Sequence, residues 1–600
     1  MTTYTMEIST TKAAGVTTDD CLVFKLVGGK EFEFPVTAVT DHSFRVQADS
    51  RVTTGFYTLF LLHNGRRYYI GQSNIDLHVP IVIDPGTGVN LYGAVTCDGV
   101  GIPNVLVSDG DEIVKTDAQG VYQIKSDKRW KYVFVIIPSG YLPPLQGIMP
   151  EFHAALDEKA AVETPERRDF TLERVQNENF TLFVLGDMHL ANRNQDVSQF
   201  DKVMKDLQET MASTSGPKYF LTLGDMTWDL YWVDNKFCFP EYIALAEKYL
   251  DGEYVFHTMG NHDNDPSAAG DFLKAFRYTR DICPTYYSFN IGGIHFIVLD
   301  DTDFNDAPVG DRSNYRADLT AGQMQWLIKD LSYVPKGSKL VISSHIPVFY
   351  PNSSLKFSNH WNGVDAPGEC GTPEFIELLK DYDVQMLTAH SHEVFNYRAN
   401  PNFEEHNMGA ICATWWWSGK LTPGVHIGQD GAPGGYGVFT FNGTNMSHYF
   451  KSPGWPASHQ FRAYDMGKVK EVVVPSLGAS RAGFQKYVDY MAAYDDNDIL
   501  VNVWDFDPAW TVSVKEEGVE LPIRQAWTLD PLHIVAMTAK RFQSAAEPNF
   551  ITERWWHFFV ARATKRNSTV EVIVTDRNGN VYTETMRRPK TFAVSDYTVK

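Results

Sequence analysis

The fold of the central part of this chain is decided by three stretches: FTLFVLGDMH at 180–189, KYFLTLGD at 218–225 and EYVFHTMGNHD at 253–263. Each is a short apolar run that ends in a polar tip, and amphipathic stretches at 199–211 and 240–250 separate them. Apolar runs that alternate with helical periodicity predict parallel strands covered on both faces by helices. The sequence therefore predicts an α/β domain here.

The same pattern continues toward the C-terminus. Apolar runs with polar tips recur as IHFIVLDD at 294–301, KLVISSH at 339–345 and VQMLTAHSH at 384–392, again with helix-like segments between them. The α/β domain is therefore expected to cover 179–455.

The flanking regions have period-2 alternation instead, which predicts β-domains. Residues 1–82 are expected to form a small β-domain of immunoglobulin-like type, and the turn-rich DPGTG at 84–88 marks its end. A β-sandwich is predicted over 85–156, followed by a polar connection. Its pattern resembles transthyretin-like or carboxypeptidase-regulatory modules. Alternation returns after the α/β domain, so residues 465–600 are expected to form a C-terminal β-sandwich.

Composition restricts the partners of the chain. The 600 residues carry a formal net charge of −21, which argues against non-specific binding to the phosphates of DNA or RNA. No apolar run approaches the roughly 18–20 residues that span a bilayer. The start, MTTYTMEIST, lacks the basic and apolar regions of a secretory signal. The oligomeric state is left open.

The polar tips of the apolar runs gather the residues that suggest chemistry. Ligands of open α/β sheets collect at the carboxyl ends of strands, so residues far apart in the sequence can converge there. This set contains oxygen and nitrogen donors but no thiolate, which favours Mn, Fe, Zn, Co or Ni over a structural Cys-rich zinc site. Its members are Asp187, His189, Asp225, Asn261, His345, His390 and His392.

This ordered set of motifs resembles the calcineurin-like metallophosphoesterase family over 179–455. The resemblance implies an α/β sandwich with open sheets and two divalent or trivalent metal ions. It implies that one metal is held by Asp187, His189 and His392, and that Asp225 bridges both. Asn261, His345 and His390 would hold the second metal. Ala389, where the family usually has glycine, is a departure that removes no ligand.

The resemblance also implies a reaction. Two bound cations can neutralise a phosphate ester and activate a water at neutral pH, so the expected function is hydrolysis of a small-molecule phosphate ester. His262 would donate a proton to the leaving group, and Asp263 would orient it. Whether the ester is a monoester or a diester stays open. The alternative is a carbohydrate- or surface-binding scaffold with a vestigial hydrolase core, which a measurement of bound metal would distinguish.

The flanks narrow the resemblance to a bacterial subgroup with accessory domains. The C-terminal similarity lies in VNVWDFDPAWTV, LDPLHI and VTDRNGNVYTETMRRPK. Members of the subgroup are typically exported, which implies a periplasmic or extracellular location. Protein Ser/Thr phosphatases are argued against because no Arg follows Asp225 or flanks GNHD. Purple acid phosphatases are argued against because Trp228 stands where they need tyrosine.

Aromatic residues and one arginine are the candidates for substrate contact. Trp415, Trp416, Trp361 and Tyr350 could wall a groove over the metals, although packing between domains would explain them equally well. Arg316 is a candidate for contact with the substrate phosphate.

Overall fold

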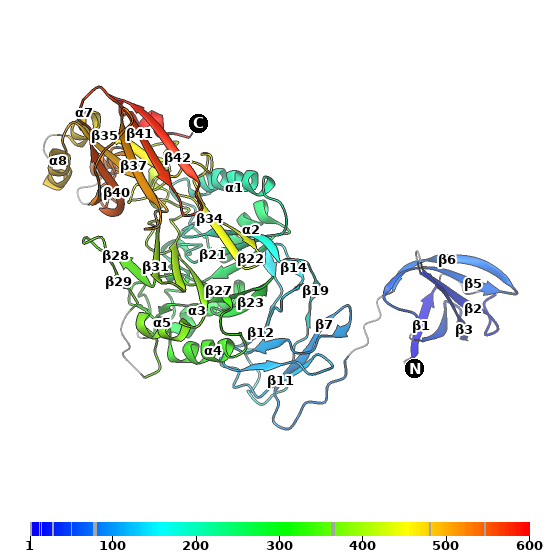
Figure 1. Ribbon diagram of the computed structural model, residues 1–600. Coiled ribbons are helices and arrows are strands. Elements are labelled where there is room, and N and C mark those ends of the chain that lie inside the picture. The colour runs from blue at the N-terminus through cyan, green and yellow to red at the C-terminus, as the bar shows by residue number, and fades with distance from the viewer. Residues whose placement is uncertain are drawn as a thin grey trace. The chain divides into compact units, whose positions relative to one another are not determined.

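The computed structural model describes residues 3–599 except 11–12, 14, 27–28, 50, 76–80, 306, 362–366, 479–481 and 545–547. The chain forms two compact units, each described by itself (Figure 1). The first comprises Met1–Asp84 with Thr96–Ile102, and the second comprises Pro85–Val95 with Pro103–Lys600.

The first unit is a six-stranded antiparallel sheet in the order β1-β4-β3-β2-β5-β6. Alternation along its strands buries one set of side chains, including Leu22, Phe24, Phe34 and Val46, in a common core. The strands are β1 (Thr3–Ser9), β2 (Cys21–Leu26), β3 (Glu31–Val39), β4 (Ser43–Asp49), β5 (Gly55–His63) and β6 (Arg66–Ile75).

The second unit begins with two small sheets. One has the order β10-β9-β12-β16 and the other contains β11-β7-β17. Trp326 Nε1 of the α/β domain donates to Ser108 Oγ at 3.1 Å, so these sheets pack on the α/β domain. The strands are β7 (Leu91–Cys97), β9 (Leu106–Ser108), β10 (Ile113–Lys115), β11 (Val121–Ile124), β12 (Tyr132–Ile136), β16 (His153–Ala155) and β17 (Glu166–Arg167).

The α/β domain contains two sheets. In the first, of order β22-β21-β20-β33-β34, the three strands that precede site residues are parallel and β33 and β34 are antiparallel additions. Helices α1 (Asp196–Ala212) and α2 (Phe239–Leu250) connect its parallel strands. The strands are β20 (Asn179–Leu185), β21 (Lys218–Leu223), β22 (Tyr254–Thr258), β33 (Tyr436–Asn442) and β34 (Asn445–Lys451).

The second sheet has the order β23-β24-β27-β30-β32-β31, with parallel inner strands and antiparallel edges. Helices α4 (Ala321–Leu331) and α5 (Thr372–Leu379) connect strands of this sheet, and Figure 1 shows both beside its strands. Helix α3 (Asp271–Asp281) contacts α2 of the first half instead. The strands are β23 (Tyr287–Ile291), β24 (Ile294–Val298), β27 (Lys339–Ser343), β30 (Asp383–Thr388), β31 (Phe395–Asn400) and β32 (Phe403–Asn407).

Aromatic side chains join the two sheets face to face. Phe180 of β20 lies 6.2 Å from Phe296 of β24 between ring centroids, and Phe256 of β22 stacks on Phe289 of β23 at 3.9 Å. Near the strand ends, Thr258 and Ser343 share a hydrogen bond of 2.9 Å. The carboxyl ends of both sets of parallel strands therefore meet at one edge of the sandwich.

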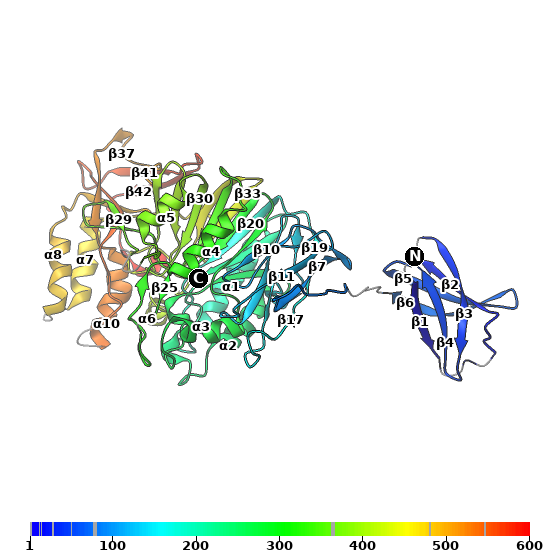
Figure 2. The ribbon, with the colours of Figure 1, turned by 90° about the horizontal axis from the view of Figure 1, so that it is seen from below.

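The C-terminal domain packs two four-stranded sheets, β35-β36-β40-β39 and β38-β37-β41-β42. It also contains helices that the alternation did not predict: α7 (Met466–Leu477), α8 (Gln485–Ala492), α9 (Pro531–His533) and α10 (Ala539–Ser544). Figure 2 shows α7 and α8 side by side at its outer side. The strands are β35 (Arg462–Asp465), β36 (Asp498–Asn502), β37 (Thr511–Glu516), β38 (Val519–Glu520), β39 (Ile523–Thr528), β40 (Trp555–Arg562), β41 (Thr569–Thr575) and β42 (Val581–Arg587).

The predicted fold class, an α/β core with flanking β-domains, is confirmed. Among the described residues, no helix is long and apolar enough to cross a membrane.

Candidate metal centre

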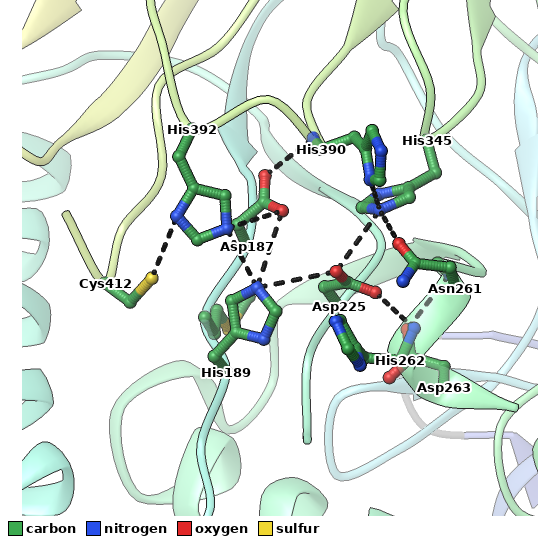
Figure 3. A network of polar contacts seen from close by, with 12 residues as sticks. Asp187, His189, Asp225, Asn261, His262, Asp263, His345, His390, His392 and Cys412 are labelled. Carbon is green, nitrogen blue, oxygen red and sulfur yellow. Dashed lines mark hydrogen bonds and ion pairs between the residues drawn. The ribbon is translucent and has the colours of Figure 1, made fainter. Parts of the chain in front are cut away.

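The seven residues that the sequence singled out converge at the carboxyl edge of the two sheets (Figure 3). Each follows a parallel strand directly, because a strand that ends at this edge delivers its next residues to the site. Six of the side chains are at least nine-tenths buried, and His390 is half-buried. The set follows β20 (Asp187, His189), β21 (Asp225), β22 (Asn261), β27 (His345) and β30 (His390, His392).

Backbone contacts hold the strand-end loops against each other. The N–H of Asp187 donates to the carbonyl of Gly224, and the N–H of His189 donates to the carbonyl of Asp225 at 2.8 Å. Two positions in these loops require glycine, because a side chain would collide with the site. A Cβ on Gly224 would lie 2.7 Å from His345 Nδ1, and one on Gly260 would lie 2.3 Å from Asp225 Oδ1.

The backbone of the site is strained. Residues other than glycine rarely adopt a positive φ, and such residues persist where the surrounding structure enforces them, often at functional sites. Five of the seven residues have positive φ: Asp187 at 47°, His189 at 42°, Asp225 at 53°, His390 at 64° and His392 at 63°.

A first group of donor atoms surrounds one point. His189 Nε2 and His392 Nε2 lie 2.9 Å apart, and Asp187 Oδ1 is 3.8 Å from the first and 3.3 Å from the second. Asp225 Oδ2 lies 3.4 Å from His189 Nε2. Ligand atoms at about 2.0–2.2 Å from one metal ion are spaced by about 3 Å, so this group fits a single cation.

A second group adjoins it and shares Asp225. His345 Nε2 lies 3.3 Å from Asp225 Oδ2, 3.0 Å from Asn261 Oδ1 and 3.1 Å from His390 Nδ1. The same oxygen, Asp225 Oδ2, therefore faces both groups, as Figure 3 shows. This sharing is the geometry that two neighbouring cations need from a bridging carboxylate.

Backbone carbonyl groups engage Nδ1 of two histidines and leave their Nε2 atoms free to bind metal. His345 Nδ1 faces the carbonyl of Leu223 at 2.7 Å, and His392 Nδ1 faces that of Ala413 at 3.1 Å. A carbonyl only accepts, so each Nδ1 carries the hydrogen and each Nε2 points into the site.

The two carboxylates are oriented in the same way. The N–H of His390 donates to Asp187 Oδ2 at 3.0 Å, and the N–H of His262 donates to Asp225 Oδ1 at 2.8 Å. The remaining oxygen of each carboxylate faces the site. Asp187 Oδ1 is buried and forms no hydrogen bond with any described residue, which fits a metal ligand.

Protonation favours the same assignment. Burial holds the pKa of His189 and His390 well below the usual value, so both are neutral as metal ligands must be. Burial alone would lower the pKa of His345, but the charge of Asp225 and its hydrogen bond raise it to about 10. A proton between His345 and Asp225 thus stands in the position that a cation would take, and metal binding would release it.

Comparisons with known proteins agree with this geometry. The family model described as calcineurin-like phosphoesterase matches residues 180–394. Models of the N-terminal and C-terminal parts of calcineurin-like phosphoesterases match residues 89–175 and 405–582. The chain belongs to the calcineurin-like phosphoesterase family. Its central domain is that of a metal-dependent phosphoric ester hydrolase, in a family that binds a dinuclear metal centre.

Two curated relatives are plant proteins. Purple acid phosphatase 23 of Arabidopsis thaliana is 29% identical over 212 residues, which are 32% of this chain and 40% of that protein. Purple acid phosphatase 15 of the same plant is 26% identical over 160 residues, 25% of this chain and 26% of that protein. The chain thus spans less than half the length of either.

Among solved structures, a dimetal phosphatase from Danio rerio is 13% identical, covering 46% of this chain and 96% of its own, with a TM-score of 0.31. A 5'-nucleotidase precursor from Thermus thermophilus is 11% identical, covering 68% and 89%, with a TM-score of 0.26.

In this calcineurin-like phosphoesterase, the partner of His262 differs from the prediction. His262 Nδ1 lies 2.7 Å from Asp229 Oδ1, and Arg312 Nε lies 3.5 Å from the other oxygen of Asp229. Asp263 is fully buried and accepts the N–H groups of Gly260 and Thr227 instead. The expectation that Asp263 orients His262 is therefore wrong: Asp263 holds the loop, and Asp229 holds the imidazole.

The signal for Asp229 in the sequence is weak. It lies four residues after Asp225 in the same loop, and η1 (Asp229–Tyr231) turns its side chain back toward His262. An acidic residue so close to a strand-end aspartate is also common in ordinary turns, so only the backbone geometry of η1 identifies its partner.

Ala389 and Trp228, which depart from the patterns of the family and of one of its sub-families, fit their surroundings. The methyl group of Ala389 faces Gly186, whose missing side chain leaves room for it. Trp228 packs edge-on against His189 and His262, with ring centroids 5.4 and 5.8 Å away. The argument from Trp228 against the purple acid phosphatase sub-family stays a prediction, and so does the argument against Ser/Thr phosphatases.

Two of the tryptophans proposed to wall a substrate groove do not reach it. Trp416 is 1% exposed and its Nε1 donates to the Met188 carbonyl at 2.8 Å. Trp361 is 3% exposed and donates to the Ile346 carbonyl at 3.1 Å. Both are core residues, so these two predictions are wrong.

The other two aromatic candidates have different positions. The ring of Trp415 stacks on His392 at 3.8 Å between centroids, and Phe550 of the C-terminal domain stacks on Trp415 at 4.3 Å. Trp415 therefore does lie beside the metal centre. Tyr350 packs edge-on against Trp555 at 5.3 Å, which is contact between domains rather than a substrate wall.

Arg316 is also not available to a substrate phosphate. Its guanidinium donates to Asp303 at 2.7 Å and to Glu369 at 2.8 Å, and Asp318 lies 3.4 Å away. Three carboxylates surround one cation, so the proposal that Arg316 binds phosphate is wrong.

Proposed function

We propose that the whole chain hydrolyses a small-molecule phosphate ester with two metal ions, using activated water as the nucleophile. One observation carries the proposal: Asp225 Oδ2 faces two separate groups of ligand atoms, at 3.4 Å from His189 Nε2 and 3.3 Å from His345 Nε2.

The first metal would be held by Asp187, His189, His392 and Asp225, and the second by Asn261, His345, His390 and Asp225. Nitrogen and oxygen donors without thiolate suit Mn, Fe, Zn, Co or Ni. Two such cations, when bound, supply Lewis-acid neutralisation of the ester and lower the pKa of water to near neutrality.

The residues of the chain perform the remaining tasks. Burial of Asp187, Asp225 and His345 lowers the local dielectric constant, which would strengthen the attraction between bound cations and an anionic substrate. Hydrogen bonds from backbone N–H groups to Asp187 and Asp225 fix their orientation, so that little reorganisation is needed when the substrate arrives.

His262 is the proposed general acid. A carboxylate only accepts, so the hydrogen on Nδ1 points to Asp229 and Nε2 is the nitrogen left for the leaving group. Burial alone would lower the pKa of His262, but the charge of Asp225 and the hydrogen bond with Asp229 raise it. The raised pKa favours the protonated imidazole, which can donate its proton to a departing alkoxide.

The proposal is tested by metal reconstitution. Chelator-treated protein is given Mn, Zn or Ni and assayed on a panel of phosphomonoesters and phosphodiesters. The Asp225→Asn variant should regain neither full metal content nor activity. The matched control is His295→Gln, because His295 is also buried but bonds to Asp330 away from the site. Hydrolysis by metal-free protein would refute the proposal.

Export to the periplasm or the exterior is proposed from the sequence resemblance, and it is tested by fractionating the native host.

A further inference from the structure

One loop of the α/β domain, residues 413–416, holds the imidazole of His392 in two ways. The Ala413 carbonyl faces His392 Nδ1 at 3.1 Å. The ring of Trp415 stacks on the ring of His392 at 3.8 Å between centroids, with the two planes 19° apart. The carbonyl fixes the direction of Nε2, and the indole covers the flat side of the imidazole. The orientation of His392 therefore depends on the conformation of the 413–416 loop.

The backbone of the 413–416 loop is strained. Ala413, Trp415 and Trp416 have φ of 50°, 47° and 63°. A residue other than glycine is unfavourable at positive φ, and it persists there where the surrounding structure enforces it. Contacts from outside the loop are therefore expected to hold it in this shape.

The C-terminal domain supplies the first of these contacts. The ring of Phe550 stacks on the ring of Trp415 at 4.3 Å between centroids, with the planes 29° apart. Phe550 also lies edge-on to Trp228 at 6.4 Å, and Trp228 in turn contacts His189. Trp415 thus links a ring of the C-terminal domain to the ring of His392.

A buried hydrogen-bond chain supplies the second contact. Thr414 Oγ1 lies 2.9 Å from His533 Nε2, and His533 Nδ1 lies 2.8 Å from Thr552 Oγ1. All three side chains are fully buried. Thr552 comes two positions after Phe550, so one segment of the C-terminal domain, residues 549–552, takes part in both contacts with the 413–416 loop.

The 549–552 segment is itself fixed in place. Arg541 Nη2 donates to Asn549 Oδ1 at 2.8 Å, and Gln429 Nε2 donates to the Ile551 carbonyl at 2.6 Å. Phe550 lies between these two anchored residues and has a positive φ of 59°. Its neighbours hold the backbone on both sides, so the ring of Phe550 is kept against Trp415.

We propose that Phe550 is a positioning residue of the metal centre, which holds the 413–416 loop against His392 from the C-terminal domain. In this position His392 Nε2 lies 2.9 Å from His189 Nε2 and 3.3 Å from Asp187 Oδ1, as a shared metal ion requires. The inference rests on the proposed function, because it takes His392 as a ligand of the first metal. It gives the C-terminal domain a task in metal binding.

The effect should be confined mainly to the first metal. Trp415 lies beside both imidazoles of the first ligand group, since its ring centroid is also 6.0 Å from that of His189. The second group is oriented by other contacts: His345 Nδ1 faces the Leu223 carbonyl, and His345 Nε2 faces His390. Loss of Phe550 should therefore weaken one of the two metal positions much more than the other.

The test measures zinc affinity in the full-length protein. Chelator-treated wild-type protein and the Phe550→Leu variant are titrated with Zn²⁺ in competition with a chromogenic chelator. Leucine keeps an apolar side chain but removes the flat ring that stacks on Trp415. One of the two zinc affinities should fall about tenfold or more, as happens when a group that orients a metal ligand is removed. The zinc concentration that gives half-maximal hydrolysis should rise by the same factor.

Two further variants separate positioning from general packing. Phe550→Tyr keeps the aromatic ring and should keep the wild-type zinc affinities. Phe357→Leu removes a different aromatic contact between the domains, because Phe357 of β29 (Phe357–Asn359) lies edge-on to Trp556 of β40 at 5.0 Å. It should leave both zinc affinities unchanged. Thermal unfolding checks that every variant is folded.

The outcomes distinguish this inference from the proposed function. Unchanged zinc affinities in Phe550→Leu, or an equal loss in Phe550→Tyr or Phe357→Leu, would overturn the inference while the two-metal function stands. Wild-type protein that binds no zinc would refute the proposed function, and the inference would fall with it.

Discussion

Replacement of His262 by alanine should change the dependence of the rate on the leaving group. In the structure, Nδ1 of His262 is held by Asp229 at 2.7 Å and the side chain is 26% exposed, so Nε2 is the proton donor that a substrate meets. A general acid contributes about 10²–10⁴-fold, or about 3–5 kcal/mol, when the leaving oxygen needs a proton. His262→Ala should therefore lose about that much on an alkyl phosphate.

A good leaving group provides the contrast. 4-Nitrophenolate departs as an anion, so the same variant should lose less than about tenfold on 4-nitrophenyl phosphate. Asp229→Asn should fall between, because it removes one charge-assisted hydrogen bond, worth about 1.5–3 kcal/mol. The assay is steady-state kcat/KM across phosphate esters of graded leaving-group pKa, with metal content measured in parallel. Equal losses on all esters, or loss of metal, would refute the assignment of His262 as the acid.

Three further predictions concern the metal bridge, the pH profile and the domains. Asp225→Asn should lose at least one metal and reduce turnover by several orders of magnitude while the fold is kept, which elemental analysis and circular dichroism would show. Full metal content with normal turnover would contradict the assignment of Asp225 as the bridging ligand. Because Asp225 and Asp229 raise the pKa of His262, hydrolysis of alkyl phosphates should persist toward alkaline pH and then fall as His262 deprotonates. In Asp229→Asn this fall should begin at lower pH, and a pH profile identical to that of the wild-type protein would contradict the role of Asp229. Removal of residues 1–82 should leave the metal content unchanged, since no predicted ligand lies there, and loss of metal in this truncation would contradict the boundary near residue 84. Removal of 460–600 should destabilise the α/β domain, because it removes contacts such as that between Tyr350 and Trp555.

Much of the site could be predicted because strand-end residues are fixed by topology. Once β20, β21 and β22, and likewise β27 and β30, are recognised as parallel strands, their carboxyl ends share one edge within each sheet, and the packing of the two sheets brings both edges together. Asp187, Asp225 and His345 then follow from position alone. Their roles as ligands remain predictions until metal is measured.

The parts that failed depend on side-chain direction and partners, which local sequence patterns do not determine. Asp263 and Asp229 are both carboxylates near His262, and only the turn of η1 shows which one reaches the imidazole. Trp415 and Trp416 are adjacent, yet one stacks on His392 and the other is buried in the core. Arg316 lies 13 positions from Asp303, and only the fold brings the two side chains together.

The helices of the C-terminal domain were missed for a related reason. The segment MGKVKEVVVPSL contains β-branched residues and a proline, which favour strand or turn by local preference. Its valines, such as Val469 and Val473, are buried in the core of the C-terminal domain. Burial at helical spacing outweighs local preference there.

The central claim is a two-metal site built on Asp225, and the most direct test is the metal content of protein purified without chelator. Elemental analysis should find up to two transition-metal ions per chain, chelation should remove them together with hydrolysis, and restoring Mn, Zn or Ni should return both. Full hydrolytic activity in protein shown to contain no metal would contradict the account.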